Sequence, residues 1–95
     1  MSNENQVEKK VDSKTVVLED AISFNNVEYK EITITKLKIK HFKGVNLDSL
    51  RTEDAVRLIS NNTGIPQLAI EELSMFDFSR VQEALTYFLE TSQEK

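Results

Sequence analysis

The side chains that could take part in catalysis are few in this sequence. The chain has one histidine, two glycines and no cysteine. The histidine, His41, stands between Lys40 and Phe42 with no carboxylate beside it, so nearby positive charge disfavours its protonation. We interpret it as a surface or loop residue rather than a general base. Without cysteine the chain has no thiolate nucleophile, no disulfide and no zinc-ribbon site.

Two pairs of adjacent carboxylates, Glu53-Asp54 and Glu71-Glu72, are the remaining candidates for binding a cation. Neighbouring side chains on a helix diverge, so we interpret both pairs as solvated helix faces. Gly44 and Gly64 are too few for a phosphate-binding loop or a dinucleotide fingerprint. We therefore predict a protein that is not an enzyme, with no cofactor and no metal.

One basic segment, Lys36–Lys43 (KLKIKHFK), interrupts a chain of formal net charge −4. It is compatible with a solvated strand face, with a site for an acidic protein partner, and with a strand lying against phosphates. The acidic flanks would repel nucleic acid, which disfavours the last of these. The residues of this segment that we name as candidates for binding a partner are Lys36, Lys38, Lys40 and Phe42.

A helix-turn-helix is the second candidate for nucleic-acid binding. Residues 54–73 fit its pattern, with residues 65–73 as the recognition helix. Gln67 is the only side chain there suited to reading bases, while Glu71 and Glu72 would face phosphates. A small helix-turn-helix DNA-binding regulator is therefore our alternative hypothesis, and nucleic-acid binding is disfavoured.

The length of 95 residues, with 39% apolar and 29% charged side chains, fits one small soluble domain. It excludes large catalytic barrels. No apolar run is long enough to span a membrane, and the polar start lacks the apolar core of a signal peptide. We predict a disordered tail at 1–14, a single domain at 15–91 and a frayed end at 92–95.

The start of the domain has the composition of β-strands. Residues 15–22 alternate apolar and polar side chains, and residues 27–35 are rich in β-branched ones. Asn25 and Asn26 between them can both adopt the positive φ of a primed turn, which predicts an antiparallel hairpin. Apolar residues change face within the second arm, which indicates a bulge or a sheet covered on both sides. The lysine-rich segment 36–40 is a candidate third short strand.

In the second half the apolar spacing changes from two to about 3.6 residues and predicts three helices. Thr52 caps the first, Gly64 ends it, and Pro66 begins a second of about two turns. Ser74 and Asp77 resemble a capping box before the third. The expected buried stripes are Ala55, Leu58 and Ile59, then Ala69, Ile70 and Leu73, then Val81, Ala84, Leu85, Phe88 and Leu89. This order predicts an α+β fold, an N-terminal antiparallel hairpin packed on three C-terminal helices.

Residues 15–89 also carry short motifs in a characteristic order. Leu18–Ile22 lies in the first strand, Asn25–Tyr29 forms the turn, and Phe42–Gly44 forms a short loop. Thr63–Pro66 joins two helices, and Asp77-Phe78 introduces the last one. In this order and spacing the chain resembles the tail assembly chaperones of Mu-like, contractile-tailed bacteriophages.

The resemblance implies a non-enzymatic protein that binds and solubilises the tape-measure protein while the phage tail assembles. It implies a location in the host bacterial cytoplasm and absence from the mature virion. Further partners that it implies are the tail-tube protein, a form of the chain extended by a translational frameshift, and a second copy of the chain. Such a chaperone needs an exposed apolar surface, and Met75, Phe76 and Phe78 form an apolar cluster that is either core or partner-binding surface.

Overall fold

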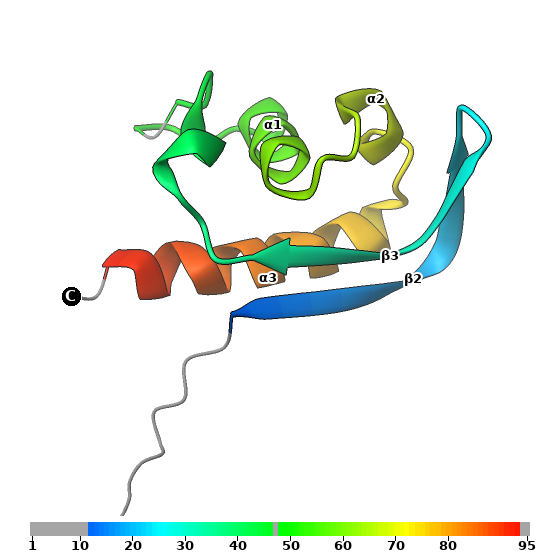
Figure 1. The fold of residues 1–95 in the computed structure, drawn as a ribbon, viewed down its shortest axis with the longest axis horizontal. Coiled ribbons are helices and arrows are strands. Elements are labelled where there is room, and N and C mark those ends of the chain that lie inside the picture. Colours follow the sequence, from blue (N-terminus) through cyan, green and yellow to red (C-terminus); the bar gives the residue numbers. More distant parts are fainter. Residues whose placement is uncertain (1–11, 47, 94–95) are drawn as a thin grey trace, which may run out of the picture.

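A β-hairpin followed by helices makes up the fold, which confirms the predicted α+β class (Figure 1). The structure, a computed structural model, describes residues 12–46 and 48–93. Its elements are β2 (Ser13–Phe24), β3 (Val27–Thr35), the 3₁₀ helix η1 (Ile39–Phe42), α1 (Thr52–Thr63), α2 (Gln67–Ile70) and α3 (Met75–Gln93). In Figure 1, α1 and α2 lie side by side over the hairpin and α3, and the hairpin tip rises beside α2.

The hairpin turn is the predicted one. Asn25 and Asn26 have φ of 52° and 67°, and the residues before and after them, Phe24 and Val27, pair directly. Positive φ at both central positions is the type I′ geometry, whose twist matches that of two antiparallel strands.

A wide bulge interrupts the ladder in the first arm of the hairpin. Val17 pairs with Glu31 and Ile22 pairs with Tyr29, so residues 18–21 of β2 face only Lys30 of β3. The predicted irregularity is therefore a bulge, and its extra residues lie in β2 rather than in the second arm. The bulge adds an odd number of residues to β2, so Val16 pairs with Ile32 but Ile22 pairs with Tyr29, which accounts for the change of face in the second arm.

The limits of the sheet differ from those predicted. Residues 1–11 of the predicted tail lie outside the described residues, but Ser13 pairs with Thr35, so β2 begins before residue 15. Within the described residues the sheet has two strands, and the third short strand considered at residues 36–40 is absent. The segment turns into η1 at Ile39. At the other end, α3 continues to Gln93, into the segment expected to fray.

The helix boundaries confirm one predicted cap, correct another and shorten the second helix. Gly64 ends α1 in the left-handed conformation, with φ of 82° and its N–H donated to the Ser60 carbonyl. Thr52 is the first residue of α1 rather than its cap, and the Asp54 carboxylate accepts the N–H of Arg51 at 3.0 Å instead. The second helix is one turn, not two, because the chain leaves it after Ile70 to reach α3.

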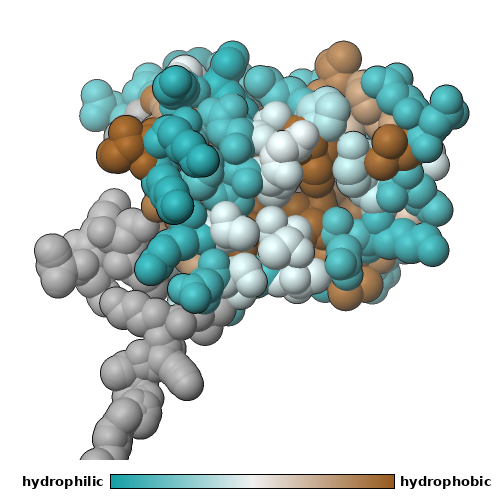
Figure 2. Space-filling model, in the orientation of Figure 1, coloured by the Kyte–Doolittle hydropathy of each residue, from teal (hydrophilic) through white to brown (hydrophobic). Residues whose placement is uncertain are grey.

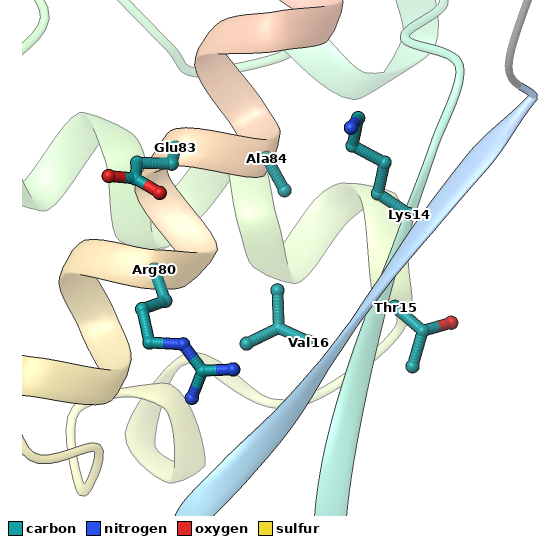
Figure 3. Close-up of a pocket in the computed structure, with 6 residues that line it drawn as sticks. All are labelled: Lys14, Thr15, Val16, Arg80, Glu83 and Ala84. Carbon is teal, nitrogen blue, oxygen red and sulfur yellow. The ribbon is translucent and has the colours of Figure 1, made fainter.

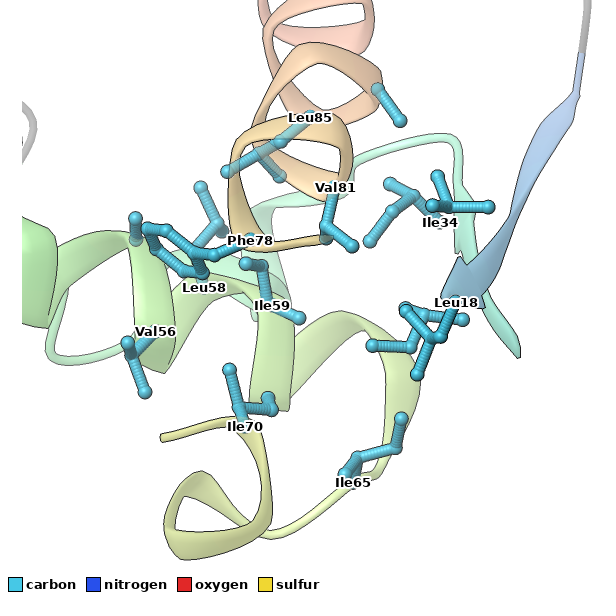
Figure 4. Close-up of a cluster of buried hydrophobic side chains, with 14 of the residues drawn as sticks. Leu18, Ile34, Val56, Leu58, Ile59, Ile65, Ile70, Phe78, Val81 and Leu85 are labelled. Carbon is cyan, nitrogen blue, oxygen red and sulfur yellow. The ribbon is translucent and has the colours of Figure 1, made fainter. Parts of the chain in front are cut away.

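One apolar core lies between the hairpin and the helices (Figure 4). Leu18 of β2, Ile34 of β3, Ile59 of α1, Ile70 of α2 and Leu85 of α3 are all buried in it. The predicted helix stripes are confirmed, with Leu73 and Leu89 only partly buried at the margin. Every element apart from η1 contributes buried apolar side chains, so the helices hold the small sheet in place.

Candidate partner-binding site

The start of α3 is fixed to the hairpin by Asp77. Ser74 caps the helix, its hydroxyl accepting the Asp77 N–H at 3.1 Å. The Asp77 carboxylate does not complete a capping box. It accepts the N–H of Glu19 at 3.0 and 3.1 Å and the N–H of Asp20 at 3.0 Å, both in the bulge of β2. Two N–H groups of the bulge are therefore satisfied by a side chain of the helix that packs against it.

Asp77 carries a buried negative charge. Its exposed fraction is 0%, and Arg80 donates from Nη1 both to its Oδ1 at 3.3 Å and to the Val17 carbonyl at 2.8 Å. The hydrogen bond from the Glu19 N–H, followed by those from Asp20 and Ser74 and the charge of Arg80, lowers the pKa of Asp77 despite its burial. Asp77 is thus a charged clamp between α3 and β2.

The apolar cluster predicted at this helix start divides into two parts. Met75 and Phe76 in the first turn of α3 are 77% and 58% exposed, whereas Phe78 is buried in the core. The Arg80 guanidinium lies 5.5 Å from the centre of the Phe76 ring. Phe78 is therefore a core residue, and Met75 and Phe76 are the exposed members of the cluster.

An apolar pocket of about 170 Å³ opens beside Met75. It lies where the N-terminal end of α1, the end of α2 and the start of α3 meet. Its lining residues are Thr52, Val56, Ile70, Glu71, Leu73, Met75 and Phe78. Phe78 forms part of the pocket wall from within the core. The pocket and the exposed first turn of α3 together form an apolar surface with one acidic rim residue, Glu71.

The basic segment lies at the opposite end of α1. Lys36, Lys38 and Lys40 are exposed as predicted, and Phe42 is partly buried against the core. Ile39 is 88% exposed, because the chain turns into η1 and loses the alternation of a strand. In Figure 2, hydrophilic side chains cover the face over η1, and apolar ones show between α1 and α2.

Two consecutive asparagines attach this segment to α1. Asn61 donates from Nδ2 to the carbonyls of His41 at 2.8 Å and Lys43 at 3.1 Å. Asn62 pairs with the backbone of Thr35, accepting its N–H at 2.9 Å and donating to its carbonyl at 3.1 Å. The amide of Asn62 thereby occupies the free edge of β3 where a further strand would pair.

His41 is buried in η1, which corrects the expectation of a surface or loop residue. Its Nδ1 accepts the Lys38 N–H at 2.9 Å and lies 3.3 Å from Nδ2 of Asn62. Burial, then the charges of Lys40 and Lys38, lower its pKa, in agreement with the disfavoured protonation that the sequence predicted. Neutral His41 accepts the hydrogen bond that holds Lys38 against η1.

A second depression, of about 480 Å³, separates β2 from α3 (Figure 3). Val16 and Arg80 point into it, while Thr15 points to the other face of the sheet, where its hydroxyl lies 2.8 Å from that of Thr33. Lys14 and Glu83 complete its polar rim. It is open and mainly polar, which is the character of a solvated groove beside a strand edge rather than of an apolar ligand site.

The structure also bears on two other kinds of site, a metal site and a DNA-recognition helix. Within 12–46 and 48–93 there is no group of three or more His, Cys, Asp or Glu side chains that could hold a metal ion. The helix-turn-helix alternative also loses its recognition helix, since α2 is four residues long and Ala69 and Ile70 are buried. A recognition helix must instead lie exposed along the major groove.

Comparison with known families identifies the chain. The model of the phage tail assembly chaperone proteins described as E, or 41 or 14, matches residues 15–90. The chain belongs to this family. The match runs from the start of β2 almost to the end of α3, so it covers the bulge, the clamp at Asp77 and the basic segment. The chain is therefore a phage tail assembly chaperone, as the resemblance indicated.

Two further comparisons were with curated proteins and with solved structures. No curated protein and no solved structure matches the chain. Among the residues that the structure describes, no helix is both long and apolar enough to cross a membrane.

Two features of this tail assembly chaperone were missed by sequence reasoning. The pocket depends on contacts between three helices and has no local signal. The clamp at Asp77 did have one, because the capping-box position holds Asp where Glu or Gln is usual. The carboxylate of this shorter side chain instead lies against the backbone of a different element.

Proposed function

We propose that the chain binds the tape-measure protein through Met75 and Phe76 and keeps it soluble during phage tail assembly. The observation that carries the proposal is the exposure of these two large apolar side chains on the first turn of α3. Membership of the tail assembly chaperone family supports a client among tail proteins. A long helical client would present apolar side chains at helical spacing, which this surface suits.

The surface combines an adaptable contact with a rigid one. Met75 has a flexible, polarisable side chain that fits varied apolar partners. Phe76 is held by the Arg80 guanidinium over its ring, and Arg80 is in turn fixed to the Val17 carbonyl. The pocket beside Met75 can take one apolar side chain of the client, and Leu73 lies in its wall. A client helix bound across α3 would thereby bury its apolar side chains against this surface.

The proposed role has further parts that follow the family. The protein acts without catalysis in the cytoplasm of the host bacterium and is absent from the mature virion. The phage is of the Mu-like, contractile-tailed kind, and the tail-tube protein and a frameshift-extended form of the chain are further partners. In the basic segment, Lys36, Lys38 and Lys40 speed the encounter with acidic partners, and Phe42 supports the loop from below.

Co-expression with the tape-measure protein tests the proposal. The wild-type chain should raise the soluble fraction of the client. Met75→Asp and Phe76→Asp should return it to the level of the client alone, because each buries an unpaired charge in an apolar contact. Val27→Asp, at an exposed apolar residue of β3, is the matched control and should keep activity. Melting curves establish that each variant is folded.

The basic segment gives a contrasting measurement. Lys38→Glu with Lys40→Glu should slow association with the client and reduce its salt dependence, with a smaller effect on affinity. If the lysine changes abolished client binding while Met75→Asp and Phe76→Asp left it intact, the contact would be electrostatic. The proposed apolar site would then be wrong.

A further inference from the structure

We propose that the outer edge of β2 binds an extended, acidic segment of another protein as an added strand, along the groove between β2 and α3. The proposal goes beyond the helical contact with the client and does not rest on it. It is carried by main-chain groups at this edge and by the positive charges beside them. In strand addition, main-chain hydrogen bonds supply the affinity and alternate side chains supply the specificity.

The direction of the main chain at this edge follows from two hydrogen bonds. The Asp12 carbonyl accepts an N–H at 3.0 Å from the residue after β3, so Asp12 faces β3. The Val17 carbonyl accepts from Nη1 of Arg80 at 2.8 Å, so Val17 faces away from β3. Because successive residues of an antiparallel strand alternate in direction, Ser13 and Thr15 also face away.

These outward groups have no partner among the described residues. Within 12–46 and 48–93, no group bonds to the outward N–H or carbonyl of Ser13 and Thr15, and both residues are exposed. The other edge of the sheet differs, since the Asn62 amide bonds to both main-chain groups of Thr35. A side chain thus blocks one edge, and the other is open to a further strand.

The groove of about 480 Å³ gives the added strand its place (Figure 3). Its volume lies within the range of about 300–1,000 Å³ found for ligand sites. Val16 of β2 and Ala84 of α3 line it, and the single methyl group of Ala84 leaves room for side chains of the added strand. Alternate side chains of that strand would enter the groove, and the others would lie on the outer face beside Thr15.

The bulge sets the length of the added strand. From residue 18 onward β2 leaves its ladder, and Asp77 accepts the N–H groups of Glu19 and Asp20. The open edge therefore covers residues 13–17, which is about 17 Å at about 3.4 Å per residue. A partner segment of about five extended residues matches this length.

The charges beside the groove favour an acidic segment. Lys14 and Arg80 line it, and Glu83 is its one acidic lining residue. Among the described groups, Arg80 forms its hydrogen bonds through Nη1 alone, so Nε and Nη2 are left to bind a carboxylate at two points. The Lys14 ammonium lies 4.4 Å from the centre of the Tyr87 ring, on the α3 side of the groove. A carboxylate on the inner face of an added strand would therefore meet two cations.

Amide hydrogen exchange, followed by NMR on the full chain, tests the proposal. The probe is a capped peptide of about seven residues in which Glu alternates with Val, with an expected dissociation constant of about 10 μM to 1 mM. Saturating peptide should slow exchange of the outward N–H groups of Ser13, Thr15 and Val17 at least about tenfold. The N–H groups of Lys14 and Val16 face β3 and should not change. Unchanged exchange at the outward groups would overturn the proposal.

Two control peptides separate main-chain pairing from other binding. The same peptide N-methylated at every residue has no N–H to donate and cannot form a ladder, so it should protect no amide of β2. A peptide with Lys in place of Glu should bind at least about tenfold more weakly. If the N-methylated peptide bound as well as the probe, side chains alone would be recognised and strand addition would be wrong.

A matched pair of variants tests the charge of the groove. Lys14→Glu should weaken binding of the acidic peptide at least about tenfold and strengthen binding of the peptide that carries Lys. Lys38→Glu makes the same change at an exposed lysine outside the groove and should have little effect. Equal losses for both would contradict recognition in the groove. Met75→Asp should leave peptide binding unchanged, which separates this proposal from that of client binding.

The chain without peptide gives a further measurement. The outward N–H groups of Ser13 and Thr15 should exchange faster than those of Lys14 and Val16 at every protein concentration. Slow exchange that did not depend on concentration would mean that residues 1–11 of the same chain already cover the edge. Slow exchange that appeared only at high concentration would mean that a second copy covers it. Either result would overturn the proposal of a different protein as the partner.

Discussion

At the scale of single residues, Asp77 shows how one carboxylate joins two distant parts of the chain. It accepts backbone N–H groups from Glu19 and Asp20, 58 and 57 residues away in sequence. We expect Asp77→Asn to lower the melting temperature markedly, because the amide NH₂ would face those N–H groups and leave buried donors unpaired. Asp48→Asn, on an exposed loop residue, is the control and should have almost no effect. Equal melting temperatures for the two variants would contradict the role of Asp77 as a clamp.

His41 predicts a dependence of stability on mildly acidic pH. Its folded-state pKa lies below the usual 6.5, so the unfolded chain binds the proton more readily. The stability due to neutral His41 should be complete above about pH 6.5 and decline as the pH falls towards its folded pKa. Melting curves from pH 8 to pH 5 measure this. In His41→Gln, whose side-chain oxygen can still accept the Lys38 N–H but does not titrate, the decline over this range should be smaller.

Asp77 also contributes stability that is lost as the pH falls, but over a more acidic range than His41. Its folded-state pKa lies below the usual 3.8, so its contribution is present above that value and is lost as the pH falls through the folded pKa. The wild-type protein should therefore unfold at a higher temperature, or at a higher denaturant concentration, at pH 4 than at pH 3. The difference between the two pH values should shrink in Asp77→Asn.

At the scale of elements, α3 is the helix on which the core depends. Leu85 and Phe88 lie on its buried stripe, and α3 packs against both strands. Leu85→Ala and Phe88→Ala should each cost about 2–5 kcal/mol of unfolding free energy, since lost burial adds to the cost of a cavity. Urea unfolding measures this, with Gln82→Ala on the exposed face as a near-neutral control. Unchanged midpoints for both core variants would mean that the stripe does not carry the core.

At the scale of the whole molecule, the charge distribution disfavours nucleic acid as a partner. The chain has 12 basic and 16 acidic residues, and its basic segment is one loop at one end of α1. We expect no binding to duplex DNA even at about 50 mM salt, where contacts to phosphates are strongest. A fluorescence anisotropy titration measures this. Salt-dependent nanomolar binding would revive the regulator hypothesis despite the short α2.

The sequence determined the features that depend on near neighbours along the chain. Period-two and period-3.6 patterns identified the strands and the helix stripes, paired asparagines specified the turn, and Gly64 specified the end of α1. The order of the motifs gave the family. These predictions succeed because backbone conformation and amphipathic spacing are local properties.

Only the tertiary structure decided which apolar residues stay exposed. Phe76 and Phe78 lie on roughly opposite faces of α3, because two positions turn a helix by about 200°. Asp77 on the bulge of β2 holds the face that carries Phe78 against the core and leaves Phe76 in solvent. Ile39 is exposed for a related reason, since Asn61 and His41 hold its segment as a loop against α1 instead of a third strand. The pocket beside Met75 exists only where three helices meet. Such contacts join residues far apart in sequence, so no local pattern encodes them.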